Sequence, residues 1–282
     1  GFAVTKEPGT DLFAQRFQEA GYTVLAFDHR HLGASGGSPR QVAPIRGQLE
    51  DWHAALDLAA TLPGVDPGRL AIWGFSLSGG HVVRVAASRP GLAGAVAQTP
   101  NVDGPATARN AARFTTPLAL VRLTGRGLLD MLRGLVGAEP LLVPLVGAPG
   151  TVALLSTPDS LADGEAALNP GGRHPGWLQA VAARSALPVT TYRPGRDASR
   201  VRCPLLVVVA EQDRSAPSGP AARVAAAAPR GELVRIPGGH YTPFLDGHER
   251  AVVAEVEFLG RALGTPENSP IRGRSTAPTP LA

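Results

Sequence analysis

Cysteine is nearly absent from this chain, since Cys203 stands alone among 282 residues. A single cysteine excludes an intrachain disulfide, and nothing else in the sequence favours an oxidising compartment, so we expect a cytoplasmic protein. Long apolar runs are missing too, because the longest candidate, residues 141–155, is interrupted by prolines and glycines. A membrane-spanning helix needs about 20 predominantly apolar residues, and we therefore expect no membrane span.

The chain also lacks any concentration of positive charge. Its 27 Lys and Arg residues outnumber its 23 Asp and Glu residues only slightly, and they are scattered along the sequence. Proteins that bind nucleic acids usually gather their basic residues into a stripe or patch, so we expect no nucleic-acid partner. No phosphate-binding loop, dinucleotide fingerprint or metal-ligand spacing is present. We therefore expect an activity that needs neither a cofactor nor a metal ion.

What the chain does contain is an alternation of apolar runs and helical periodicities, in residues 1–100 and again from residue 201. The apolar runs predict strands at residues 22–27, 69–73, 93–97, 204–210 and 232–236. Helical spacing of apolar residues predicts helices at residues 11–20, 46–60, 77–88, 220–228 and 248–263. This alternation is typical of a mostly parallel sheet with helices on both faces.

The alternation stops between residues 101 and 200. This stretch is rich in Gly, Pro and Arg and holds short helix-like pieces such as residues 118–136. Residues 265–282 are rich in Pro, Ser, Thr and Arg without apolar periodicity, which predicts a disordered tail. We therefore expect core segments at 1–100 and 201–264, an insertion at 101–200 and a tail at 265–282.

Ser76 lies in the most informative stretch, Gly74-Phe75-Ser76-Leu77-Ser78-Gly79-Gly80, between a predicted strand and a predicted helix. Small residues beside the serine allow the strand and the helix to pass closely. A strained turn at this point holds the serine hydroxyl clear of the sheet, where it can attack a carbonyl carbon. The alternative is that Ser76 merely caps the helix that follows it.

This strand–turn–helix resembles the nucleophile elbow of the α/β-hydrolase superfamily, and the resemblance covers nearly the whole chain. Ser78 replaces the last Gly of the usual Gly-x-Ser-x-Gly pattern, a form similar to that of Xaa-Pro dipeptidyl-peptidases, polyketide acyltransferases and thioesterases. The resemblance implies an α/β-hydrolase fold in which residues 101–200 form a helical cap over the active site. Apolar residues of the cap then either line an acyl pocket or form the cap's own core: Leu128, Leu129, Met131, Leu132, Leu135, Leu141, Leu142 and Val143.

Ser76, Asp213 and His240 occur in the chain order of the α/β-hydrolase nucleophile, acid and base. Each follows a predicted strand, so a parallel sheet brings all three to its carboxyl edge. A serine hydroxyl needs an imidazole to take its proton, and the imidazole needs a carboxylate to orient it. Glu211, two residues before Asp213, and Asp103, after the preceding strand, are alternative candidates for the acid.

The same resemblance implies an oxyanion hole made by the backbone N–H groups of Phe2 and Leu77. Gly1 then corresponds to the glycine that ends an N-terminal strand in this superfamily. About three strands normally precede that glycine, so we expect a sheet whose N-terminal strands are missing. An inactive fragment, or a piece that needs a partner segment, is therefore one alternative for the whole chain.

The polar loop at residues 28–37 contains Asp28, His29, Arg30 and His31. Two histidines and an aspartate so close together raise the possibility of a metal site. The loop also resembles a structural Asp-x-Arg-Gly loop of α/β-hydrolases, in which we expect Asp28 and Arg30 to form a local ion pair and turn cap. We favour the structural interpretation.

Together these features predict a serine hydrolase that cleaves a carboxylic ester or thioester of a small-molecule acyl substrate through an acyl-enzyme on Ser76. An acyltransferase with the same acyl-enzyme and an Xaa-Pro-type peptidase are the catalytic alternatives. The sequence leaves the acyl chain length, the leaving group and the oligomeric state open.

Overall fold

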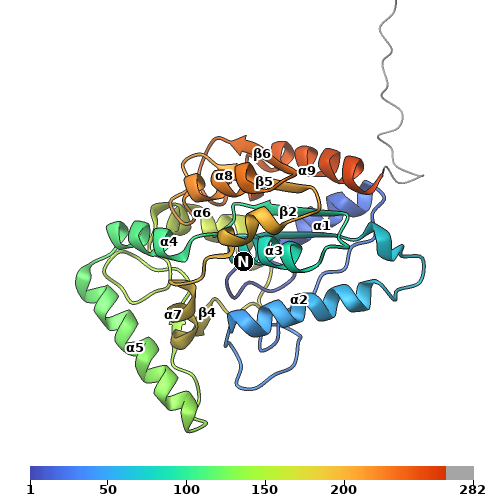
Figure 1. The fold of residues 1–282 in the computed structure, drawn as a ribbon. Coiled ribbons are helices and arrows are strands. Elements are labelled where there is room, and N and C mark those ends of the chain that lie inside the picture. Colours follow the sequence, from blue (N-terminus) through green and yellow to red (C-terminus); the bar gives the residue numbers. More distant parts are fainter. Residues whose placement is uncertain (265–282) are drawn as a thin grey trace, which may run out of the picture.

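The computed structural model describes residues 1–264, and the predicted tail at 265–282 lies outside the described residues. Its main sheet has four parallel strands in the order β1-β2-β5-β6 (Figure 1). The strands are β1 (Ala71–Phe75), β2 (Gly94–Gln98), β5 (Leu205–Ala210) and β6 (Gly231–Ile236). All four were predicted from apolar runs, with ends within about two residues, which is the usual uncertainty of strand boundaries.

Successive residues of the strands contribute to opposite layers of core, as the two-residue repeat of a strand requires. On β5, Leu206 and Val208 belong to one buried cluster, while Leu205, Val207 and Val209 belong to the other. The continuous Leu/Val run of this strand is thus buried on both faces, as is typical of parallel sheets.

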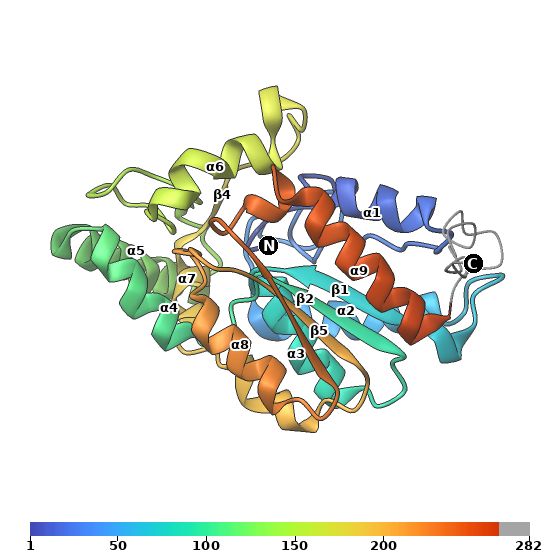
Figure 2. The ribbon, with the colours of Figure 1, turned by 90° about the horizontal axis from the view of Figure 1, so that it is seen from above.

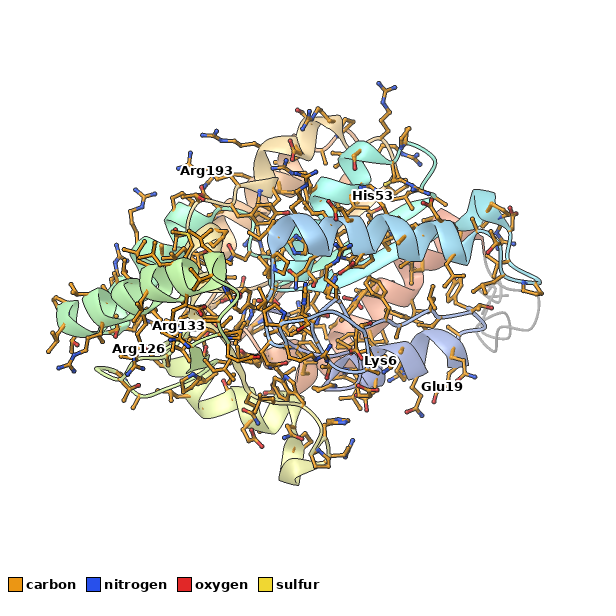
Figure 3. All side chains as sticks on the ribbon, turned by 90° about the horizontal axis from the view of Figure 1, so that it is seen from below. Lys6, Glu19, His53, Arg126, Arg133 and Arg193 are labelled. Atoms are coloured by element: carbon orange, nitrogen blue, oxygen red, sulfur yellow. The ribbon has the colours of Figure 1, made fainter. Side chains whose placement is uncertain are left out.

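Helices cover both faces of the sheet (Figure 2). On one face lie α2 (Ile45–Ala59), α3 (Leu77–Ser88) and α8 (Ser218–Ala227), and on the other lie α1 (Thr10–Glu19) and α9 (His248–Leu263). Figure 3 shows the molecule from below, with His53 on α2 and Glu19 on α1. The predicted helices therefore correspond to observed ones.

The segment between β2 and β5 includes the insertion that was predicted at residues 101–200. It contains α4 (Gly104–Ala111), α5 (Pro117–Leu135), α6 (Pro158–Leu168), α7 (Ala186–Val189) and a short antiparallel pair, β3 (Leu142–Pro144) and β4 (Ala180–Ala182). The strand pair was not predicted, because three-residue strands leave no recognisable period. Val143, Leu168 and Val181 of the insertion belong to the same buried cluster as Phe13 and Leu206 of the core.

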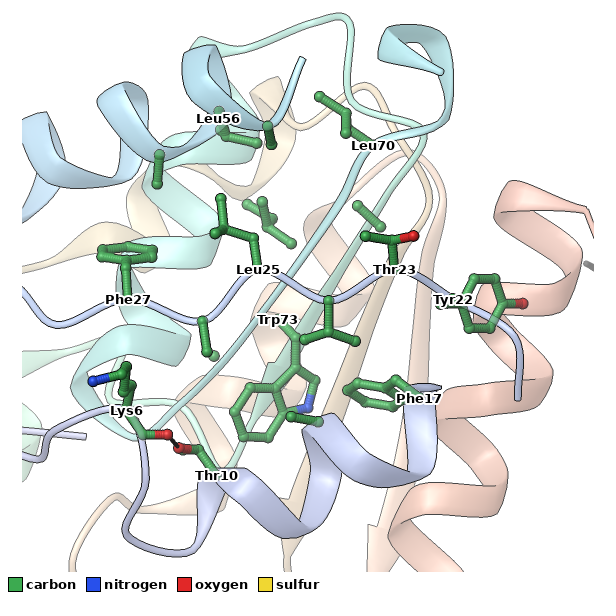
Figure 4. A pocket seen from close by; sticks show the side chains of 18 of the residues that line it. Lys6, Thr10, Phe17, Tyr22, Thr23, Leu25, Phe27, Leu56, Leu70 and Trp73 are labelled. Carbon is green, nitrogen blue, oxygen red and sulfur yellow. Dashed lines mark hydrogen bonds between the residues drawn. The ribbon is translucent and has the colours of Figure 1, made fainter. Parts of the chain in front are cut away.

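The predicted strand at residues 22–27 is wrong as regards pairing, since this segment belongs to no sheet. Its side chains still alternate, with Thr23, Leu25 and Phe27 on the same side (Figure 4). A cavity of about 530 Å³ lies between this segment and Trp73 of β1. The segment therefore has the side-chain alternation of a strand without a hydrogen-bonded neighbour.

The polar loop at residues 28–37 is held by ion pairs that differ from those expected. Asp28 pairs with Lys6 and accepts the N–H groups of Lys6 (2.7 Å) and Ala34 (2.8 Å). Arg30 instead pairs with Asp51, at 2.6 Å between Nε and Oδ1. The expected Asp28–Arg30 pair is therefore wrong, because each residue finds its partner on another segment of the chain.

Candidate active site

Ser76 occupies a strained turn between the end of β1 and the start of α3. Its φ and ψ angles are 55° and −121°, in a region that residues other than glycine rarely adopt. The turn is tightly packed, because a Cβ atom on Gly79 would lie 2.9 Å from the Cβ atom of Pro100. A Cβ atom on Gly80 would lie only 2.3 Å from the carbonyl oxygen of Asn101. The turn thus requires small residues at these two positions, whereas residue 78 can be a serine.

A chain of hydrogen bonds joins three side chains from separate loops. The Oγ atom of Ser76 lies 3.0 Å from Nε2 of His240, and Nδ1 of His240 lies 2.7 Å from Oδ2 of Asp213. The other carboxylate oxygen of Asp213 accepts the N–H groups of Ser215 (2.9 Å) and Ala216 (2.6 Å). The carboxylate is thereby fixed, and it orients the imidazole toward the serine.

The charge balance around His240 favours its protonated form. Burial lowers the pKa of His240, but the negative charge and hydrogen bond of Asp213 outweigh that effect and raise it overall. Burial in turn raises the pKa of Asp213, although its contact with His240 opposes the change. An imidazole in this setting accepts a proton from a neighbouring hydroxyl more readily than an isolated histidine does.

The two alternative acids lie elsewhere. Asp103 is the N-cap of α4, where its side chain accepts the N–H group of Ala106 at 3.2 Å. Glu211 is exposed and follows directly after β5. Among residues 1–264, Asp213 is the carboxylate that contacts the His240 ring.

Residues 8–256 match the sequence model of the Alpha/beta hydrolase family. The chain belongs to this family. It is 38% identical over 263 residues to the quorum-quenching protein AidA of Acinetobacter baumannii, a match that covers 93% of this chain and 84% of AidA. It is also 32% identical over 152 residues to the polyketide transferase grgF of a Penicillium species, covering 54% of this chain and 49% of the relative.

Solved α/β-hydrolase structures share the fold. The crystal structure of the α/β-hydrolase GrgF from Penicillium superposes with a TM-score of 0.74 at 24% identity, over 93% of this chain and 88% of that one. A monoacylglycerol lipase from Paleococcus ferrophilus gives a TM-score of 0.66 at 18% identity, over 92% and 91% of the two chains. Both comparisons show the α/β-hydrolase fold, and the mostly parallel sheet predicted from the sequence is confirmed.

In this α/β-hydrolase a second carboxylate, Asp159, joins the two loops that carry Asp213 and His240. Asp159 lies in the first turn of α6, within the insertion. Its Oδ2 atom accepts the N–H groups of Arg214 (2.8 Å), Ser215 (3.2 Å) and His240 (3.3 Å). Burial alone would raise the pKa of Asp159, but the hydrogen bonds and the charge of His240 lower it overall, which keeps the carboxylate ionised.

Three buried hydroxyl groups surround this junction. Those of Thr157, Ser160 and Ser215 lie within 2.7–2.8 Å of one another, and Ser215 Oγ also donates to Asp159 Oδ1 at 3.0 Å. Asp159 and this cluster were not predicted from the sequence. The sole available signal was an aspartate in the first turn of a short helix, which occurs in many helices for reasons of capping and dipole alone.

Ser76 opens onto a cavity of about 220 Å³. Its lining is mostly apolar and comes from the N-terminal segment, from β1, from the insertion and from the loop after β6: Phe2, Val4, Phe75, Leu145, Val146, Leu154, Leu155, Leu161, Leu168, Trp177 and Tyr241. Phe2 and Ser76 therefore face the same cavity. Leu77 follows Ser76 as the first residue of α3, so its N–H group has no carbonyl partner within the helix.

The apolar residues of α5 do not line this cavity. Leu128, Leu129, Met131, Leu132 and Leu135 are exposed to solvent, so the expectation that they line an acyl pocket or form a cap core is wrong. Val143 is buried, in agreement with the second of those alternatives. In residues 1–264 there is no group of three or more His, Cys, Asp or Glu side chains arranged to hold a metal ion. Within the same range no helix is both long and apolar enough to cross a membrane.

Proposed function

We propose that this α/β-hydrolase is a serine hydrolase that cleaves a carboxylic ester or thioester, with Ser76 as nucleophile, His240 as base and Asp213 as acid. The observation that carries the proposal is the continuous chain of contacts from Ser76 Oγ through both nitrogens of His240 to Asp213. A serine that only capped α3 would bond to the helix backbone, and Ser76 makes no such bond.

The reaction follows from these positions. His240 Nε2 takes the proton of Ser76 as Oγ attacks the carbonyl carbon, while Asp213 stabilises the resulting imidazolium. The N–H groups of Phe2 and Leu77 hold the oxyanion of the tetrahedral intermediate, each contributing about 3–4 kcal/mol of barrier lowering in comparable sites. His240 then protonates the departing alcohol or thiol. A water molecule then gives a proton to His240 and attacks the carbonyl carbon of the acyl-enzyme. Ser76 takes the proton back as the carboxylic acid is released.

The mostly apolar cavity beside Ser76 favours a substrate whose bound part is an apolar acyl group. Its size and lining suit a small acyl chain, with Ser160, Glu165 and Gln179 as polar residues besides Ser76. The name of the relative AidA refers to quorum quenching. A signal molecule that contains an ester bond, including a lactone as an internal ester, is therefore part of the proposed substrate class. The proposal also includes a cytoplasmic location, because a chain with a single cysteine forms no intrachain disulfide that would need an oxidising compartment.

The second candidate function is acyl transfer to an alcohol or amine, supported by similarity to polyketide transferases. It uses the same acyl-enzyme and differs only in the acceptor that attacks it. Peptidase activity of the Xaa-Pro type ranks third, because no peptide-binding feature accompanies the Ser76 motif. An inactive product remains the non-enzymatic alternative.

The proposal is tested by measuring the turnover of a panel of esters, thioesters and lactones. The wild type and the Ser76→Ala variant are compared on each substrate. We expect the substitution to reduce kcat by roughly a thousandfold or more on every substrate that the wild type cleaves. Equal turnover by the two proteins would refute the assignment. Repeating the assay with an added alcohol, and measuring the ratio of new ester to free acid, separates the transferase from the hydrolase.

A further inference from the structure

The outer face of α5 is apolar and unpartnered. Eight large apolar side chains on this helix and at its end are exposed: Leu118, Val121, Leu128, Leu129, Met131, Leu132, Leu135 and Val136. The inner face carries the buried residues Ala119, Gly127 and Asp130, together with Leu123, which packs against the buried cluster of the core. A Cβ atom on Gly127 would lie 3.1 Å from Leu187, which shows how closely that face packs on the protein. The exposed apolar face is thus not required for packing α5.

Arginines border this face. Arg122, Arg126 and Arg133 recur at helical spacing, which places them in one row between the apolar face and the inner face. Arg122 and Arg126 are exposed, and neither lies within ion-pair distance of a carboxylate of residues 1–264. Figure 3 shows Arg126 and Arg133 along α5.

No exposed negative charge on this helix offsets the row. Residues 104–139 contain five arginines and two acidic residues, Asp130 on the helix and the exposed Glu139 four residues beyond its end. Asp130 is buried and accepts the N–H groups of Leu141 (2.7 Å) and Arg184 (2.9 Å). The surface of this part of the insertion is therefore positively charged beside its apolar face.

We propose that α5 docks on the surface of an anionic lipid bilayer, with its leucines among the acyl chains and its arginine row at the headgroups. A helix with a broad apolar face, a cationic border and no exposed acid is typical of segments that lie in the plane of a membrane interface. A second copy of the chain fits less well, because pairing two α5 faces brings two arginine rows together and the helix itself has no exposed carboxylate to neutralise them.

The docking surface belongs to the insertion and projects from the body of the molecule (Figure 1). Another helix of the insertion, α6, contributes Ser160, Leu161 and Gly164 to the cavity beside Ser76. Docking through α5 therefore brings the insertion, which helps to form the cavity, to a surface where acyl compounds concentrate. The proposal does not depend on the chemistry of Ser76, and the binding assay can be read even if that serine is inert.

Flotation of the protein with lipid vesicles tests the proposal. The probes are vesicles of phosphatidylcholine alone and vesicles in which about a third of the lipid is phosphatidylglycerol. We expect the wild type to bind the anionic vesicles at least roughly tenfold more tightly, and to be released by high salt. The double variant Arg122→Gln/Arg126→Gln should lose about tenfold or more of this affinity. Leu132→Gln should weaken binding to both kinds of vesicle.

The helix α2 provides matched controls. Leu58 is 54% exposed, close to the 59% of Leu132, and the Arg46 side chain is 94% exposed. Leu58→Gln and Arg46→Gln should therefore bind vesicles as the wild type does. Binding that is equal for the two vesicle types, or unaffected by Leu132→Gln in a protein that remains folded, would overturn the proposal. Sedimentation that shows a dimer which Leu132→Gln dissociates would instead assign the face to a second copy.

Discussion

His240 contacts two carboxylates that act on it in different ways. Asp213 bonds to its ring, whereas Asp159 bonds to its backbone N–H group and to two N–H groups of the loop that carries Asp213. The negative charge of Asp159 also raises the pKa of His240. In the proposed mechanism Asp159 is therefore a positioning residue, which fixes the position of the imidazole and raises its basicity without touching the reacting atoms.

Replacing Asp159 by Asn removes this charge and leaves a single acceptor oxygen for several N–H donors. We expect kcat on an ester to fall about tenfold, and the acid-side pKa of the kcat/KM profile to move to lower pH. Asp163→Asn, four residues further along α6, provides the control and should leave the profile in place. An unshifted pKa in the Asp159 variant would contradict the role, even if kcat fell.

The pH dependence of the wild type follows from the raised pKa of His240. Only the neutral imidazole can accept the Ser76 proton, so activity is lost as the pH falls through the pKa of His240. Because that pKa is raised above the ordinary value of 6.5, we expect kcat/KM to decline on the acid side with an apparent pKa above 6.5. A profile that stays flat down to pH values below about 6 would contradict the charge balance described here.

At the residue scale, motif and chain order together predicted three side chains as a catalytic set, and this assignment stays a proposal. Ser76, Asp213 and His240 each follow a strand, and the structure brings these three side chains together. Asp159 could not be found in this way, because it comes from the insertion and reaches the site only through tertiary packing. A single aspartate near a helix start does not distinguish that role from ordinary capping.

At the scale of elements, the turn at Ser76 depends on how closely α3 approaches the loop after β2. We expect Gly80→Ala to destabilise the protein by about 1–3 kcal/mol, because the new Cβ atom meets a backbone carbonyl that cannot move easily. Gly125→Ala on the exposed side of α5 meets nothing within 4 Å and should stabilise the helix by about 0.5–1 kcal/mol. Urea unfolding of the two variants measures both changes, and equal effects would contradict the packing argument.

A buried acid joins α9 to the edge of the sheet. Oε2 of Glu255 accepts the indole N–H of Trp73 at 3.0 Å, and its other oxygen has no partner among the described residues. Burial raises the pKa of Glu255 well above its usual range, an effect that the Trp73 bond only partly opposes. The folded protein therefore holds a proton on Glu255 that the unfolded chain releases above pH 4.5.

Glu255→Gln should raise stability at pH 8 and have little effect near pH 4.5, since the wild type loses stability as the pH rises above the pKa of the unfolded chain. The amide keeps an acceptor for Trp73 and does not ionise. Thermal unfolding of both proteins across this range measures the difference. Glu257→Gln, at an exposed position two residues later, serves as control, and a stability difference that does not grow with pH would contradict the account.

The elements that were predicted less well are those whose apolar residues do not recur at a regular helix or strand spacing, or whose spacing does not reveal a pairing partner. Residues 22–27 have the composition of a strand, but a strand is defined by hydrogen bonds to a neighbour, which no local sequence encodes. The β3–β4 pair is too short to show alternation. In contrast, α9 was predicted at its observed bounds, His248–Leu263, because four turns of helical spacing identify it.

At the scale of the whole molecule, the insertion and the core share one buried cluster. Val143, Leu168 and Val181 pack with Phe13, Leu206 and their neighbours, so neither part has a separate interior. We expect residues 1–264 to unfold in a single transition, with equal calorimetric and van't Hoff enthalpies. Two resolved transitions would show that the insertion folds independently, and a gradual melt would support the alternative of an incomplete fragment.

The central claim is that Ser76 is an activated serine beside a formed oxyanion hole. Labelling with a fluorophosphonate, followed by measurement of the intact mass, tests this claim most directly. The probe reacts only where a base has activated the hydroxyl and N–H groups stabilise the developing charge. We expect one adduct on the wild type and none on Ser76→Ala. An adduct that persists in the variant, or no adduct on a folded wild type, would contradict the assignment of Ser76.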